Sequence, residues 1–177
     1  MGATQFAIER WRPCLLINLG TCGGFAGLSS LNEILLAEET VIYDIIEGMS
    51  DYQQAIKKYS SQADLSWLGD DAPVPIRSAR LLSADRDLRP EDIPHLVSHF
   101  KGVAADWESG AFAWVATRNR VDWLVLRGVS DLVDENKSEA LGNVSLWQQR
   151  TGPIMQTLLD CLPWIIKRYQ EKSDEGD

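Results

Sequence analysis

Residues 14–24 read CLLINLGTCGG, a continuous apolar run that ends in a glycine-rich segment. A run without polar alternation is typical of a strand that is buried on both faces, as in a parallel sheet covered by helices. Strand and helix patterns alternate through most of the remaining chain, which is the order that such a sheet requires. The sequence therefore predicts an α/β fold with a mainly parallel sheet.

The expected elements follow from periodicity and from turn residues. We expect strands at 14–20, 34–46, 79–84, 102–106 and 122–130. We expect helices at 51–62, from Pro90, at 108–120 and near the C-terminus, with a turn region at 70–78 and a polar loop at 131–143. In the last helix, Pro153 suits the first turn and Pro163 predicts a kink.

Length and composition suit one domain, because the chain has 177 residues of which 45% are hydrophobic. We expect this domain to cover 1–170 and the polar tail at 171–177 to be disordered. The three cysteines, Cys14, Cys22 and Cys161, are odd in number and far apart, which favours reduced thiols.

A net charge of −9 argues against a nucleic acid or an anionic membrane as partner, because both would be repelled. No apolar run approaches the roughly 20 residues needed to cross a bilayer, and the first residues lack the pattern of a signal peptide. We therefore expect a cytoplasmic protein whose ligands are small or neutral.

Three of the expected strands end in polar groups. They are followed by NLGTCGG (18–24), DWES (106–109) and the pair Ser130 and Asp131. Ligands of such sheets bind beyond the carboxyl ends of the strands, so these ends predict a pocket.

Each of these features also has a purely structural interpretation. The glycine segment could be a tight turn, because Cys22 stands where a dinucleotide fingerprint needs glycine and no P-loop lysine follows. Glu108 could be a first-turn helix carboxylate, and Asp131 could cap the next segment. Their convergence on one edge of the sheet favours a site.

The motifs together resemble the nucleoside phosphorylase and nucleosidase superfamily, and within it the methylthioadenosine/S-adenosylhomocysteine nucleosidases. The resemblance is carried in order by GATQFAIERWRPCLLINLGTCGG (2–24), VIYD (41–44), AADWESGAFAWVA (104–116) and VLRGVSDLVD (125–134). It implies a three-layer α/β/α domain with a mixed, mainly parallel, twisted sheet that is shortened at its N-terminus. It also implies a purine nucleosidase without cofactor or metal that forms a homodimer or a larger homo-oligomer.

The resemblance assigns roles to individual residues. It makes Asp131 the general acid that protonates the leaving base, and Glu108 the acceptor of hydrogen bonds from the ribose hydroxyls. Trp107 would form an apolar floor under the sugar, with Asp106 behind it. The remaining expected substrate-binding residues are Ser130, Thr21, Cys22, Gly23, Asp87 and Leu88.

Two departures from the family leave other functions open. The N-terminal strands and the glutamate that activates water have no counterpart here, and SADRDL (83–88) places Arg86 and Asp87 where the family has small and aromatic residues. A shortened homologue that binds nucleosides without turnover is therefore an alternative. A phosphorylase is another, although Asn18 stands where phosphorylases carry a phosphate-binding arginine, which favours water as nucleophile.

His95 and His99 are four residues apart on an expected helix, which is a spacing that metal ligands use. Leu96 follows His95, so the glutamate of an HExxH motif is absent, and no third ligand is evident. The sequence therefore favours no metal site.

Overall fold

The computed structural model describes residues 1–45 and 52–175. The strands are β1 (Leu15–Phe25), β2 (Ile34–Ile42), β3 (Ser60–Gln62), β4 (Ile76–Ser83), β5 (Ala104–Asp106) and β6 (Asp122–Val133). The main helices are α1 (Gly2–Trp11), α2 (Tyr52–Lys58), α4 (Ser109–Arg118), α5 (Val144–Asp160) and α6 (Leu162–Glu175). Between β4 and β5 lie three short turns, η1 (Pro90–Asp92), α3 (Ile93–His95) and η2 (Leu96–Phe100).

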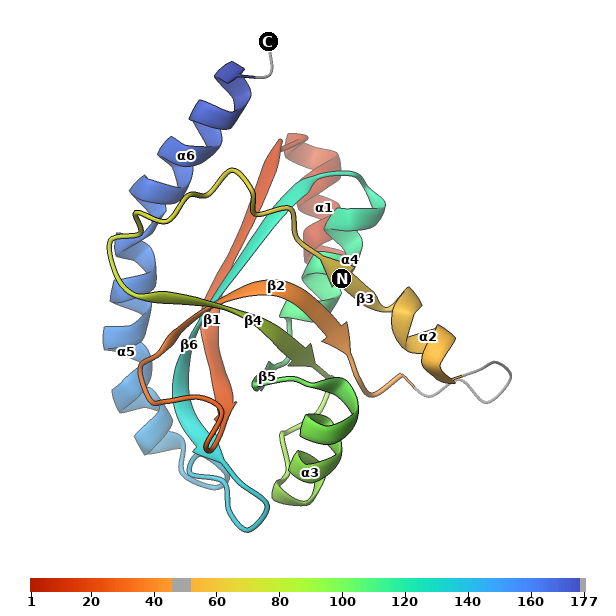
Figure 1. Cartoon of the computed structure of the whole chain (residues 1–177), viewed down its shortest axis with the longest axis vertical. Coiled ribbons are helices and arrows are strands. Elements are labelled where there is room, and N and C mark those ends of the chain that lie inside the picture. The colour runs from red at the N-terminus through yellow and green to blue at the C-terminus, as the bar shows by residue number, and fades with distance from the viewer. Residues whose placement is uncertain (46–51, 176–177) are drawn as a thin grey trace.

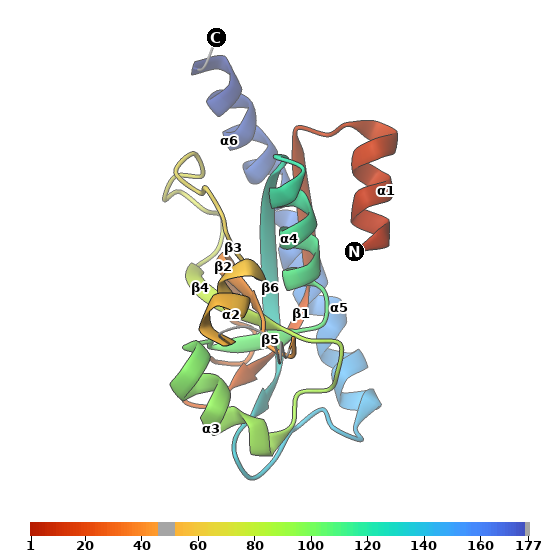
Figure 2. The same cartoon turned by 90° about the vertical axis from the view of Figure 1, so that its right-hand side faces the viewer.

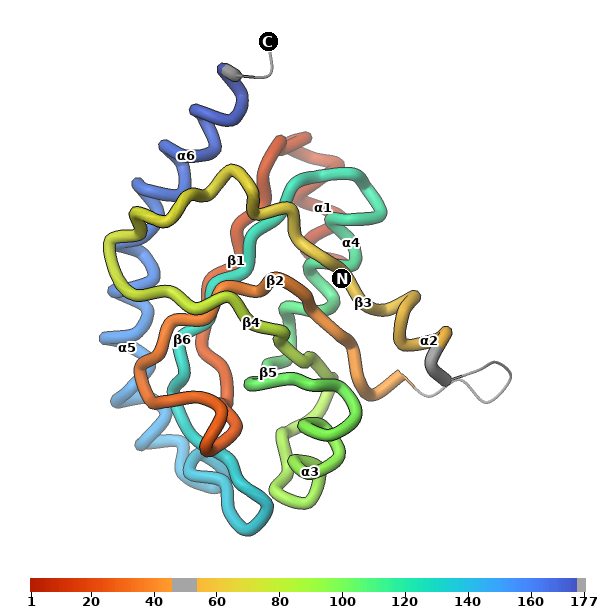
Figure 3. The backbone as a smooth tube through the Cα atoms, in the orientation of Figure 1, coloured from red at the N-terminus to blue at the C-terminus, as the bar shows by residue number. Residues whose placement is uncertain are grey.

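The strands form one six-stranded sheet in the order β3-β2-β4-β5-β1-β6. The pairs β1–β6, β2–β4 and β4–β5 are parallel, whereas β1–β5, β2–β3 and β2–β6 are antiparallel. The sheet is therefore mixed, and it is mainly parallel, as expected, because the long pairs β1–β6 and β2–β4 contain most of the paired residues. β1 and β6 pair along their whole lengths and run side by side in the backbone trace (Figure 3).

An additional pairing between β2 and β6 closes the sheet on itself. The first part of β2 pairs with β6 through Ile34, Leu35 and Leu36, and the later part pairs with β3. The strands β2, β4, β5, β1 and β6 thus form a closed ring, with β3 attached outside it.

Helices cover both faces of the long β1–β6 pair, with α5 and α6 on one side and α4 on the other (Figure 1). Alternate residues of β6 show this division. Trp123 and Val125 belong to the core cluster that includes Phe112 of α4, whereas Leu124 and Leu126 belong to the cluster of α5 and α6. The three-layer arrangement is confirmed.

α1 lies outside these layers and packs against α4 (Figure 2). None of its residues is buried, and Phe6 and Trp11 are exposed. No helix in residues 1–45 and 52–175 combines the length and the apolar character that a bilayer crossing requires.

Several expected boundaries were wrong. Residues 60–62 form β3 and not the end of a helix, because they pair with Glu39, Thr40 and Val41 of β2. β1 continues through the glycine segment to Phe25, and β6 continues to Val133 along it. β4 begins at Ile76, inside the expected turn region. β2 ends at Ile42, whereas the strand was expected to continue to residue 46, which lies outside the described residues.

The C-terminal helices also differ from expectation. Asn143 caps α5 by accepting a hydrogen bond from the backbone N–H of Leu146 at 3.3 Å, so Pro153 lies inside the helix and not in its first turn. Where Pro163 predicts a kink, the structure has an interruption between two helices, because α5 ends at Asp160 and α6 begins at Leu162. α6 continues to Glu175, so residues 171–175 are helical and not disordered, while 176–177 lie outside the described residues.

Candidate active site

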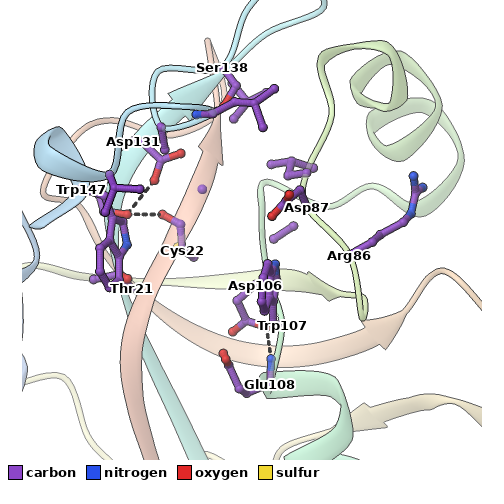
Figure 4. A pocket seen from close by; sticks show the side chains of 18 of the residues that line it. Thr21, Cys22, Arg86, Asp87, Asp106, Trp107, Glu108, Asp131, Ser138 and Trp147 are labelled. Carbon is purple, nitrogen blue, oxygen red and sulfur yellow. Dashed lines mark hydrogen bonds between the residues drawn. The ribbon is translucent and has the colours of Figure 1, made fainter.

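The predicted site residues come together around one cavity of about 580 Å³. The cavity lies where β1, β4, β5 and β6 end, and Figure 4 shows side chains from these ends directed into it. All nine expected residues line it: Asp131, Glu108, Trp107, Ser130, Thr21, Cys22, Gly23, Asp87 and Leu88. A cavity of this size fits a nucleoside-sized ligand, since small-molecule pockets measure about 300–1,000 Å³.

Asp106 is the structural anchor of this region. Its carboxylate accepts hydrogen bonds from the backbone N–H of Ser109 at 3.0 Å, from the Ser109 hydroxyl at 2.7 Å and from Ser83 at 3.1 Å. It also accepts a short hydrogen bond from Nε of Arg127 in a buried ion pair. Asp106 therefore fixes the first turn of α4 against β4 and β6.

Arg127 is a residue of this site that the sequence did not predict. Its side chain is 1% exposed, and its Nη2 lies 3.9 Å from Oε2 of Glu108. The one signal in the sequence was a single arginine inside the apolar run of β6, because a buried cation needs a carboxylate partner. Arg127 connects Asp106 at the wall with Glu108 at the surface of the cavity.

Glu108 directly precedes α4, and its side chain makes no capping hydrogen bond to that helix. The side chain is 65% exposed, so the carboxylate is accessible to a ligand. The neighbouring Trp107 is also exposed and lines the same cavity. An open carboxylate beside an apolar ring can accept hydrogen bonds from a diol whose carbon skeleton lies on the ring.

Asp131 is a buried carboxylate at the opposite wall of the cavity, with an exposed fraction of 7%. Burial raises its pKa, while the hydrogen bond from Ser130 at 2.7 Å opposes the shift. Ser130 also lies 3.3 Å from the carbonyl oxygen of Cys22. A carboxyl group that holds its proton to a higher pH than usual can act as a general acid.

Asp131 belongs to β6 itself, where it pairs with Gly23 of β1. Among the described residues, its carboxylate accepts a hydrogen bond from Ser130 and none from the following loop, so the interpretation as a cap of that segment was wrong. A Cβ atom at Gly23 would lie 3.4 Å from Oδ2 of Asp131 and 3.2 Å from the Leu88 side chain. Glycine at this position keeps the space between Asp131 and Leu88 open.

Cys22 contributes a buried wall and no reactive thiolate. Burial strongly raises the pKa of its thiol, and Asp106 adds to the shift. A thiol that stays protonated is a poor nucleophile. Covalent catalysis through Cys22 is therefore disfavoured.

The segment after β4 contributes Asp87 and Leu88. Arg86 is drawn away from them by an ion pair with Asp92 at 2.9 Å, and its guanidinium lies 5.5 Å from the centre of the Tyr43 ring. Figure 4 shows the Asp87 carboxylate directed into the cavity and the end of Arg86 directed away from it.

The sequence also missed the apolar rim of the cavity. This rim is formed by Leu141, Val144 and Trp147, all of them exposed and all at or near the start of α5. These residues lie in or beside the expected polar loop at 131–143, so only the folded chain brings them to the strand ends.

His95 and His99 are not among the residues that line this cavity. Their rings stack with centres 5.0 Å apart. Within the part of the chain that the structure describes, no group of three or more potential ligands is placed to hold a metal ion.

In sequence and in fold, the chain is similar to known nucleosidases. No model of a known protein family matches the chain. The chain is 26% identical over 171 residues to a 5'-methylthioadenosine/S-adenosylhomocysteine nucleosidase of Maridesulfovibrio salexigens, covering 89% of this chain and 73% of that protein.

Two solved structures share the fold. The apo 5'-methylthioadenosine nucleosidase of Arabidopsis thaliana superposes with a TM-score of 0.76 at 23% identity, covering 92% of this chain and 66% of that one. The futalosine hydrolase of Helicobacter pylori gives a TM-score of 0.76 at 19% identity, covering 93% and 72%. The chain thus spans about two thirds of the Arabidopsis protein and somewhat more of the other two.

The fold and the carboxylates at the strand ends point to a class: the chain is similar to proteins of the nucleoside phosphorylase and nucleosidase superfamily. Within this superfamily it is similar to the methylthioadenosine/S-adenosylhomocysteine nucleosidases.

Proposed function

We propose that this chain hydrolyses the N-glycosidic bond of a purine nucleoside, with adenine nucleosides such as methylthioadenosine or S-adenosylhomocysteine as substrates. The observation that carries the proposal is the pairing, in one cavity, of the buried Asp131 with the open Glu108. The names of the similar proteins support the substrate class.

The chemistry assigns a different task to each carboxylate. Protonated Asp131 donates its proton to N7 of the base, so that the electrons of the breaking bond between N9 and C1′ pass to a neutral leaving group. C1′ then carries oxocarbenium character and forms a bond to the oxygen of water, and the proton that this water releases to solvent is matched by the proton that Asp131 takes up again. Glu108 accepts hydrogen bonds from the ribose hydroxyls and holds C1′ in place.

The buried pair behind Glu108 supports this assignment. Asp106 and Arg127 neutralise each other, and the nearer guanidinium nitrogen is only 3.9 Å from Glu108. The buried guanidinium thus lies directly behind the carboxylate that would accept the two ribose hydroxyls.

The test is incubation of the purified protein with methylthioadenosine, S-adenosylhomocysteine, adenosine and inosine, followed by detection of the free base. We expect base release that does not depend on phosphate, because Asn18 replaces the arginine of the phosphorylases. Release only in the presence of phosphate would identify a phosphorylase. Micromolar binding measured by calorimetry without any base release would identify a protein that only binds nucleosides.

We further propose a homodimer or a larger homo-oligomer. Phe6 and Trp11 are exposed on α1, and their rings stack edge to face with centres 5.9 Å apart. Such a pair of exposed aromatic side chains suits an interface with a second copy. A single monomer mass in light scattering at micromolar concentration would contradict this proposal.

The cytoplasm is the proposed location. Cys14, Cys22 and Cys161 are all unpaired, which suits a reducing compartment. Cell fractionation tests it, and recovery in an oxidising compartment would contradict it.

A further inference from the structure

The segment after β4 contains a carboxylate that the proposed mechanism does not use. Asp87 lines the cavity and points into it, yet its carboxylate forms no hydrogen bond or ion pair within residues 1–45 and 52–175. The adjacent cation cannot neutralise it, because Arg86 is paired with Asp92 at 2.9 Å. A ligand that displaces water from this carboxylate must therefore supply a hydrogen-bond donor in its place.

Asp87 lies near the part of the cavity that the leaving base would occupy. A Cβ atom placed on Gly23 would lie 3.2 Å from the side chain of Leu88 and 3.4 Å from Oδ2 of Asp131. Leu88, the neighbour of Asp87 in the chain, is therefore close to the Asp131 carboxylate. Figure 4 shows the carboxylates of Asp87 and Asp131 directed into the cavity from opposite sides. A purine with N7 at Asp131 places its C6 substituent in the same part of the cavity, because C6 is close to N7 along that edge of the ring.

We propose that Asp87 is a specificity-determining residue that accepts a hydrogen bond from the exocyclic 6-amino group of adenine. The 6-amino group has two hydrogens, so it can donate one toward each side of the cavity. The 6-oxo group of hypoxanthine offers only lone pairs, which an ionised carboxylate repels. The proposal rests on the proposed function, since it concerns the base that Asp131 protonates.

The test compares adenosine with inosine, which differ at C6 in this way. The wild-type protein is expected to prefer adenosine in kcat/KM. Asp87→Asn introduces an amide that can donate to the 6-oxo group, and it removes the charge. The adenosine-to-inosine ratio should then fall roughly tenfold to a hundredfold, as expected for loss of a charge-assisted hydrogen bond.

Asp85→Asn is the matched control, because Asp85 belongs to the same segment but does not line the cavity. It should keep the wild-type ratio. Equal ratios for Asp87→Asn, Asp85→Asn and the wild-type protein would overturn the role of Asp87 while leaving the nucleosidase function intact.

The dissociation constants of free adenine and free hypoxanthine test the role of Asp87 without requiring hydrolysis, so they separate this inference from the proposed function. If no nucleoside is cleaved, the hydrolase assignment fails, but the ratio of the two dissociation constants still tests Asp87. A preference for adenine that Asp87→Asn reduces and Asp85→Asn keeps would support the proposal. Absence of adenine binding, or a preference that Asp87→Asn leaves unchanged, would overturn it.

Discussion

Arg127 and Asp106 form an ion pair that is almost completely buried at the wall of the cavity, and the same arginine reaches Glu108 at the cavity surface. The pair connects the interior of β6 to the start of α4. The surroundings of Glu108 therefore include two residues that need not touch a ligand themselves.

Breaking this pair should destabilise the fold. Asp106→Ala leaves the Arg127 guanidinium buried without a counter-charge, so the free energy of unfolding should fall by about 3–5 kcal/mol in urea denaturation. Arg89→Ala is the control, because Arg89 lies 3.9 Å from Glu91 and both side chains are exposed. Its effect should stay within about 1 kcal/mol. An equally small effect of Asp106→Ala would contradict the anchoring role.

Replacement of Glu108 should mainly change affinity. Glu108→Gln removes a charged acceptor and should weaken binding of substrate and transition state together by roughly 1.5–3 kcal/mol per hydrogen bond. KM for the nucleoside should rise while kcat stays close to the wild-type value. A loss confined to kcat would argue against a role in holding the ribose.

Replacement of Asp131 should mainly change the rate. Asp131→Asn cannot donate a proton, and loss of a general acid typically lowers the rate by about 10² to 10⁴. The defect should shrink for a ribosyl nitrophenol, whose leaving group needs no proton. Single-turnover kinetics with both substrates measure the effect, and an equal defect for the two would exclude Asp131 as the acid.

The pH dependence of stability should also identify Asp131. Burial raises its pKa in the folded protein, so the folded state keeps a proton that the unfolded chain has lost. The free energy of unfolding should therefore decrease as pH rises from the unfolded pKa through the higher folded one. This decrease should be smaller in Asp131→Asn than in the wild-type protein, as urea titrations across this range can show. The same deprotonation should reduce kcat as pH rises, and identical pH profiles for the two proteins would contradict the shift.

The packing of α4 can be tested at a glycine. A Cβ atom at Gly110 would lie 2.7 Å from Ile42 and 2.8 Å from Ser83, so Gly110→Ala should push the first turn of α4 away from the strands. We expect a loss of about 1–3 kcal/mol in the free energy of unfolding. A Cβ atom at Gly152 in α5 would meet no neighbouring atom within 4 Å among the described residues, so Gly152→Ala should instead stabilise by up to about 1 kcal/mol. Chemical denaturation of both variants gives the comparison, and opposite signs are the expected result.

The site could be anticipated because its residues follow strand ends. Asp106, Glu108, Ser130 and Asp131 stand directly after or at the end of apolar runs, and parallel strands bring such ends to one edge. The local sequence is therefore sufficient to predict that these residues lie close together. Their chemical roles stay predictions that the kinetic experiments above address.

Other features depend on contacts between distant segments. Residues 60–62 look helical by pattern and become β3 only because β2 offers a free edge beside them. In the sequence Arg127 is an isolated charge in an apolar run, and only the folded chain brings Asp106 to it as a partner. Trp147, which lines the cavity, belongs to α5 because the helix is capped at Asn143 and so begins earlier than Pro153 suggested. Periodicity carries no information about such pairings.

The ring of strands has a consequence for synthesis on the ribosome. β1 emerges long before its partner β6 is made, and Leu15 cannot pair before Asp122 has appeared. β2 likewise completes its pairing only with β6. Until then the nascent chain exposes apolar strands with unpaired backbone groups, which other chains could join. Folding that waits for such distant contacts is slow, so we expect a growing chain of this protein to depend on chaperones that shield β1 and β2 until translation has passed Val133.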